Sequence, residues 1–129
     1  MPPNRERRTT PQTRPTHESP NARPMTRGEI RWYRFGAPDK RRPVLVLTRH
    51  FALDYLGEVT VAPITRTIRG IDSEVALTVA DGMSRDCAIN CDHLQTIPKS
   101  KLGPLITTLG PGQLDQVGAA VLFALGFAS

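Results

Sequence analysis

Apolar and polar side chains alternate in several short stretches of this chain, at the two-residue period of a β-strand. Glu29–Phe35 alternates apolar with charged residues, which predicts a strand with one buried and one exposed face. Residues 43–48 are apolar almost throughout, as expected of a central strand that is covered on both faces. The other predicted strands are residues 58–64, 74–79, 87–92 and 102–109.

The segments between these strands carry turn residues. Residues 36–41 predict a loop, and residues 65–72 predict a polar, basic loop. Residues 49–57 predict a connection with one helical turn, and Asp81-Gly82 predicts a tight turn. Strand alternation over residues 87–92 places Cys87, Ile89 and Cys91 on one face, and Ala88, Asn90 and Asp92 on the other.

One helix is predicted, near the C-terminus. Pro111 suits a first helical position, where its missing N–H costs nothing, and Gly126 suits the end. Many short strands followed by one helix predict a mainly β (α+β) fold, a small barrel closed by the helix. The apolar stripe expected to face the core is Leu114, Val117, Val121 and Leu125.

Residues 1–26 differ from the rest in composition. They hold six of the twelve prolines, five arginines and almost no large apolar side chains. Such a segment cannot bury enough surface to offset its chain entropy, so a disordered, basic, Pro-rich tail is expected. Two alternatives stay open: a basic arm that touches nucleic acid, or a natural start of the protein at Met25. Residues 27–129 then form the single folded domain.

Charge and cysteine content narrow the function classes only slightly. The net charge is +5, but residues 1–26 carry +3 of it, so the expected domain is only mildly basic. Cys87 and Cys91 lie four residues apart and have no second pair, so a zinc site is not expected and both thiols are interpreted as buried. No apolar run is long enough to cross a membrane and no secretory signal is evident, which favours a cytoplasmic protein.

Two strand ends carry candidate chemistry. Arg42 precedes the apolar run that begins at Pro43, and Thr65-Arg66-Thr67 follows the run that ends at Ile64. Arginine and threonine side chains at strand ends suit an anion better than plain turn residues do. The anion that we expect is an RNA phosphate.

These segments together resemble the MazF/PemK family of toxin endoribonucleases. Each motif is weak alone, but their order and spacing across residues 27–126 are typical of the family. The motifs in this chain are Arg27-Gly28-Glu29-Ile30, Arg41-Arg42-Pro43-Val44-Leu45-Val46-Leu47, Val61-Ala62-Pro63-Ile64-Thr65, Cys91-Asp92-His93-Leu94-Gln95-Thr96-Ile97 and Lys101-Leu102-Gly103.

The resemblance implies a fold, an activity and partners. The fold is an SH3-like β barrel with a C-terminal helix, acting as a homodimer. The activity is sequence-specific cleavage of single-stranded RNA, without metal or other cofactor, by a growth-inhibiting type II toxin–antitoxin toxin. Attack by the ribose 2′-OH would leave a 2′,3′-cyclic phosphate and a 5′-hydroxyl. A MazE-like antitoxin would occupy the RNA groove.

The resemblance also implies three catalytic residues. Arg42 matches the family's arginine before proline and would grip phosphate oxygens, since a guanidinium stays charged at any working pH. Thr65 matches the second site residue, whose hydroxyl would hold the scissile group. Asp92 matches an acidic position that is proposed as general base in some relatives, although it could equally order a loop or contact a base edge. Kid-like members carry arginine where this chain has Asn90, so the identity of acid and base stays open.

Other polar residues near these three are candidates for binding RNA. His93 and Gln95 would read bases, and the basic side chains of two loops would follow the RNA backbone. The only tryptophan, Trp32, is interpreted as a core or dimer-interface residue. The RNA-binding candidates are Lys40, Arg41, Arg66, Thr67, Arg69, Asn90, His93 and Gln95.

Two other function classes compete with the ribonuclease. A CcdB-like toxin poisons gyrase on the same barrel without cutting RNA, but it does not need the Arg-Pro and Pro-Ile-Thr pairing found here. A plain SH3-like module binds peptides through an aromatic-lined groove, and this chain has only seven aromatic residues, without a cluster.

Overall fold

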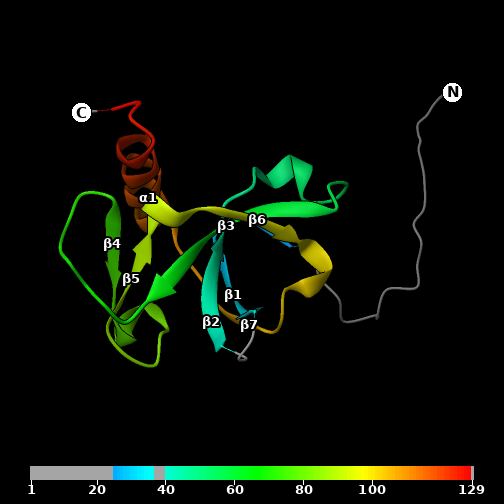
Figure 1. The fold of residues 1–129 in the computed structure, drawn as a ribbon, viewed down its shortest axis with the longest axis horizontal. Coiled ribbons are helices and arrows are strands. Elements are labelled where there is room, and N and C mark those ends of the chain that lie inside the picture. Colours follow the sequence, from blue (N-terminus) through cyan, green and yellow to red (C-terminus); the bar gives the residue numbers. More distant parts are fainter. Residues whose placement is uncertain (1–24, 37–39, 129) are drawn as a thin grey trace, which may run out of the picture.

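The computed structural model describes residues 25–36 and 40–128 and shows seven strands and one α-helix among them (Figure 1). Short 3₁₀ turns link several strands. The strands are β1 (Glu29–Phe35), β2 (Lys40–Val46), β3 (Glu58–Thr65), β4 (Glu74–Leu77), β5 (Cys87–Asn90), β6 (Gln95–Pro98) and β7 (Leu105–Thr108). The helix is α1 (Pro111–Ala124), and the 3₁₀ turns are η1 (His50–Ala52), η2 (Val79–Asp81), η3 (Cys91–His93) and η4 (Lys99–Lys101).

Strand β3 holds the sheet together because it changes partner along its length. The strand order is β4-β5-β3-β2-β1-β7, and all pairs are antiparallel. The first half of β3 pairs with β6, whereas its last two residues pair with β5. The sheet therefore curls, with β4 and β5 beneath α1 and apart from β1, β2 and β7 (Figure 1). This agrees with the mainly β fold with a C-terminal helix that the sequence predicts.

Two apolar clusters lie on the two faces of β2 and β3. Leu45 and Ala62 face a cluster that includes Val117 of α1. Val44 and Val61 face a second cluster under β6. All four side chains are fully buried, which explains why β2 is apolar throughout its second half.

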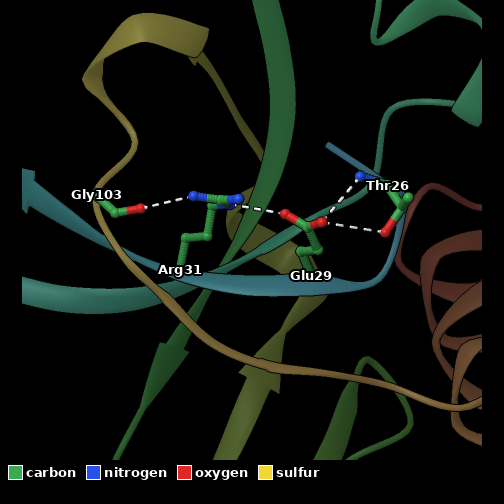
Figure 2. A network of polar contacts seen from close by, with 4 residues as sticks. All are labelled: Thr26, Glu29, Arg31 and Gly103. Carbon is green, nitrogen blue, oxygen red and sulfur yellow. Dashed lines mark hydrogen bonds and ion pairs between the residues drawn. The ribbon is translucent and has the colours of Figure 1, made fainter. Parts of the chain in front are cut away.

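A buried polar network fixes the start of β1 (Figure 2). Glu29, only 3% exposed, accepts hydrogen bonds from the backbone N–H and hydroxyl of Thr26, at 3.1 and 3.2 Å. Arg31 pairs with the same carboxylate at 2.7 Å and donates a second bond to the carbonyl of Gly103 at 3.0 Å. The network thus ties the beginning of the fold to the segment before β7, and leaves neither charge of the pair unsatisfied.

Three strand predictions are corrected by the structure. Lys40 and Arg41, expected in a loop, begin β2, because they pair with Phe35 and Arg34 across the hairpin. The strand expected over residues 87–92 stops at Asn90, whose side chain accepts a hydrogen bond from the backbone N–H of Asp92 and starts η3. Strand β6 was not predicted, and it forms by pairing with the first half of β3.

Two other predicted strands are shorter than expected, and one predicted helical turn is confirmed. The strand over residues 74–79 ends at Leu77, where Thr78 caps η2, and the strand over residues 102–109 is only Leu105–Thr108. The helical turn expected between residues 49 and 57 is present as η1.

The helix begins at Pro111 as predicted, and Gly126 follows its end with a φ of +83°. The predicted stripe is correct for Val117, Leu114 and Val121, but Leu125 is 56% exposed. Ala120 and Ala124 take part in the packing instead, and Leu125 caps the end of the helix.

The predicted tail lies largely outside the described residues, which begin at Met25. Met25 packs against the second apolar cluster and Thr26 bonds to Glu29. These two residues, which the sequence placed in the tail, therefore contact the folded domain. Within the described part of the chain, no helix has the length and apolar character needed to cross a membrane.

Candidate active site

A groove of about 600 Å³ crosses the start of β2 and the end of β3. Its described lining contains five basic and no acidic side chains, so it suits a polyanion. Segments from four parts of the chain meet here. The lining residues are Trp32, Lys40, Arg41, Arg42, Pro43, Ile64, Thr65, Arg66, Thr67, Met83, Ser84, Arg85 and Cys87.

The register of the sheet brings Arg42 and Thr65 together. Val44 pairs with Pro63, and each step toward the start of β2 moves one residue toward the end of β3. Continuing by two steps places Arg42 opposite Thr65, and strand alternation puts both on the same face. Both residues also line the groove. The sequence predicted this juxtaposition of two residues that lie 23 positions apart.

The hydroxyl of Thr65 has one fixed partner. The backbone N–H of Thr67 donates to Thr65 Oγ1 at 3.1 Å. Since the oxygen accepts this bond, the hydroxyl proton stays available for an acceptor in the groove. The turn after β3 therefore leaves the Thr65 hydroxyl free to donate to a bound group.

Four of the predicted RNA-binding residues line the groove, and one predicted arginine does not. Lys40, Arg41, Arg66 and Thr67 lie in the groove with Arg42 and Thr65. Arg69 is absent from the lining, and its backbone N–H donates to Glu74 Oε1 at 2.9 Å.

The remaining candidates form a separate polar cluster around η3. The hydroxyl of Ser73 donates to Asp92 Oδ2 at 2.6 Å. Asn90 Nδ2 lies 2.7 Å from His93 Nδ1, so the amide donates and the imidazole nitrogen accepts. Gln95 begins β6 and pairs with Val61. None of Asn90, Asp92, His93 and Gln95 is among the lining residues of the groove, so the structure does not bring Asp92 to the Arg42–Thr65 pair.

Several lining residues were missed by sequence reasoning. Met83, Ser84 and Arg85 follow η2 and reach the groove from a turn that no motif marks. Trp32, interpreted as core or interface, is half-buried and lines the groove. In the sequence, only the positive charge of Arg85 indicated a role in binding an anion. The position of this turn beside the groove depends on the curl of the sheet, which no local pattern shows.

The two cysteines are buried free thiols, as predicted. Burial raises the pKa of the Cys91 thiol from 9.0 to about 11, and the nearby Asp92 adds to the effect. Burial also raises the pKa of Cys87, which lies at the wall of the groove, with Asp86 and Asp81 as further causes. Both thiols therefore stay protonated and poorly nucleophilic near neutral pH.

We expect iodoacetamide to leave both thiols of the folded protein unmodified at about pH 8, and to modify both in concentrated urea. Mass spectrometry of the two samples counts the adducts. The free energy of unfolding should also fall as the pH rises from 9.0 toward about 11, because the folded state then holds thiol protons that the unfolded state releases. Rapid alkylation of the native protein at Cys91 would contradict the burial described here.

Comparison with known proteins identifies the family. Residues 26–125 match the family model described as PemK-like, MazF-like toxin of type II toxin-antitoxin system. Endoribonuclease MazF3 of Mycobacterium tuberculosis is 42% identical over 83 residues, which are 64% of this chain and 81% of that protein.

Two solved structures share the fold. Mycobacterium tuberculosis toxin MazF-mt6 superposes with a TM-score of 0.71 at 36% identity, covering 78% of this chain and 99% of that one. An endoribonuclease from a mycobacterial species, solved in complex with its cognate antitoxin, superposes with a TM-score of 0.73 at 23% identity. The match covers 81% of this chain and 98% of that one. The family match over most of the chain and the agreement in fold lead to one conclusion. The chain belongs to the PemK-like, MazF-like toxins of type II toxin–antitoxin systems.

Proposed function

We propose that this toxin is a metal-independent endoribonuclease that cleaves single-stranded RNA at short sequences. The observation that carries the proposal is the placement of Arg42 and Thr65 in one basic groove. The family relative MazF3 is named an endoribonuclease, which supports the same reaction class.

The proposed chemistry uses the nucleophile that RNA itself carries. The ribose 2′-oxygen attacks the adjoining phosphorus and loses its proton, while the bond from phosphorus to the 5′-oxygen breaks. The leaving 5′-oxygen takes up a proton, so the products are a 2′,3′-cyclic phosphate and a 5′-hydroxyl. The enzyme must hold the phosphate in line and stabilise the charge that develops on its oxygens.

Arg42 and Thr65 supply these two functions in the proposal. The guanidinium binds the non-bridging phosphate oxygens through two parallel N–H bonds, which restricts the orientation of the phosphate. Thr65 donates its hydroxyl proton to the same group, with its oxygen held by the backbone of Thr67. Lys40, Arg66 and Arg85 bind neighbouring phosphates and raise the local concentration of RNA.

Asp92 takes a structural role in the proposal. Its carboxylate accepts a short bond from Ser73, and its backbone is capped by Asn90. These contacts support the alternative that Asp92 orders the turn after β5, rather than the assignment as general base. Asn90, His93 and Gln95 surround the same turn and would contact RNA that extends beyond the groove.

The proposed partners are a second copy of the chain and an antitoxin. A relative that shares the fold was solved with its cognate antitoxin. An acidic antitoxin segment in this groove would meet the same five cations that bind RNA, and would therefore block the substrate. The proposed site of action is the cytoplasm, where the substrate RNA is found.

The test is incubation of the purified protein with a defined single-stranded RNA in excess EDTA, followed by mapping of the cut ends. We expect cleavage at a short recurrent sequence, with 5′-hydroxyl ends that polynucleotide kinase labels without prior phosphatase treatment. Intact RNA together with trapped gyrase–DNA complexes would support the CcdB-like class instead. Cleavage that stops in EDTA and resumes on adding Mg²⁺ would contradict the metal-independent reaction.

A further inference from the structure

We propose that Trp32 and the guanidinium that covers it form a stacking platform for one nucleobase of the bound RNA. The inference rests on the proposed function and extends it, because it assigns the groove a contact that depends on a base. No other aromatic side chain is found in the described lining of the groove.

The geometry of Trp32 and Arg41 carries the proposal. Arg41 Cζ lies 4.3 Å from the centroid of the Trp32 ring, a cation–π distance. Trp32 pairs with Pro43, and Arg41 lies two positions away on the same face of the sheet. Both residues line the groove, where Trp32 is half-buried and Arg41 exposed. An aromatic ring and a planar guanidinium are therefore already stacked beside the proposed phosphate site.

Two hydrogen bonds to the segment before β7 hold the backbone of Trp32. Its N–H donates to the carbonyl of Pro104 at 3.2 Å, and its carbonyl accepts from the N–H of Gly103 at 2.8 Å. A Cβ at Gly103 would lie 3.2 Å from the Trp32 carbonyl oxygen, so glycine permits this close approach. Arg31 binds the Gly103 carbonyl as well. Because the ring is fixed before RNA arrives, stacking on it costs little further ordering.

The chemistry of the groove explains why such a platform is needed. Its five cations bind phosphates, and phosphate contacts position the strand without distinguishing sequences. Single-stranded RNA exposes unstacked bases, which stack on aromatic rings and on arginine planes. Pro43, Ile64 and Met83 lie in the same lining and offer apolar surface to the edge of a stacked base.

The first measurement uses intrinsic fluorescence, because the chain has a single tryptophan. The probes are single-stranded DNA 12-mers with the sequence of the mapped cut site, which lack the attacking 2′-OH and stay intact. We expect saturable quenching of Trp32 emission by the unmodified probe. Probes with one abasic nucleotide at each position in turn should reveal one position whose loss weakens binding about tenfold and abolishes the quenching.

Three variants and two controls separate stacking from charge. Trp32→Leu should weaken binding about tenfold and make it insensitive to the abasic position, while Trp32→Phe keeps part of the effect. Arg41→Lys keeps the charge and should show the same selective loss. As controls, Arg66→Ala should weaken every probe alike and reduce the salt dependence, whereas Phe51→Leu, an exposed aromatic outside the groove, should change nothing.

The possible failures are distinguishable. A wild-type protein that leaves RNA intact overturns the proposed function, and the platform with it. A protein that cleaves RNA, but whose Trp32 emission is unchanged by the probe and whose binding is weakened alike by an abasic nucleotide at every position, overturns the platform alone. Circular dichroism shows whether each variant is folded. If Trp32→Leu does not fold, Trp32→Phe and Arg41→Lys decide whether the base stacks on the platform.

Discussion

Arg42→Ala is expected to lower the single-turnover rate of RNA cleavage by at least about a hundredfold, with the fold unchanged. The removal of one preorganised donor to a developing oxyanion typically costs a factor of about 10² to 10³. Arg42 is exposed at the start of β2 and belongs to neither apolar cluster, so alanine removes the phosphate contact without leaving a cavity. The measurement is quenched-flow cleavage of a defined RNA at saturating enzyme, with circular dichroism as a check on folding.

Charge and geometry are separated by two further variants. Arg42→Lys keeps the charge but loses the bidentate geometry, and should recover only part of the rate. Arg49→Ala removes an equal charge from a different hollow, beside Leu47 and Val121, and should leave the rate within about twofold. If Arg42 and Thr65 act on the same phosphate, Arg42→Ala combined with Thr65→Ala should be little slower than Arg42→Ala alone. A folded Arg42→Ala protein with full activity would reject the site.

Gly82→Ala is expected to be the most destabilising glycine-to-alanine substitution in the described fold, at about 2 to 5 kcal/mol. Two costs add at this position. Gly82 ends η2 with a φ of +97°, a conformation that L side chains rarely adopt. An added Cβ would also lie 2.6 Å from Oγ1 and 2.9 Å from Cβ of Thr107 on β7, so the turn or the strand would have to shift.

Gly70→Ala is the matched control for this prediction. Gly70 also has a positive φ, +69°, but nothing lies within 4 Å of the added Cβ. Alanine at this position should lower the free energy of unfolding by only about 1 kcal/mol, the cost of the strained backbone. Urea denaturation followed by circular dichroism measures both, and equal losses for the two variants would contradict the contact with Thr107. Because Gly82 leads directly into Met83, Ser84 and Arg85, its substitution should also disturb the wall of the groove.

The sequence predicted that Arg42 and Thr65 lie together because each residue belongs to a local pattern. An arginine before proline opens one apolar strand, and a threonine closes another. Adjacent antiparallel strands bring such ends together, so two local patterns were enough to place the Arg42–Thr65 pair. The start of the helix at Pro111 could likewise be predicted from residues close to it in the sequence.

Sequence reasoning failed where position depends on distant parts of the chain. No local pattern indicates that Asp92 lies outside the groove lining, where the cap formed by Asn90 turns the chain after β5 and the Asp92 carboxylate accepts a bond from Ser73. Its role in catalysis stays a prediction. Leu125 continues the helical spacing, yet it lies at the C-cap and is exposed. Trp32 was interpreted as a core or dimer-interface residue, but it is half-buried and lines the groove, where Arg41 from the neighbouring strand lies over its ring.

The amino-acid sequence by itself determined the positions of most strands, the start of the helix, the family and the two strand-end residues of the site. These features depend on side-chain periodicity and turn chemistry over a few residues. Only the tertiary structure decided that β3 changes partner and that the turn at Met83–Arg85 reaches Trp32 to complete the groove. Those outcomes depend on the register and curl of the whole sheet, which arise from contacts between residues far apart in the chain.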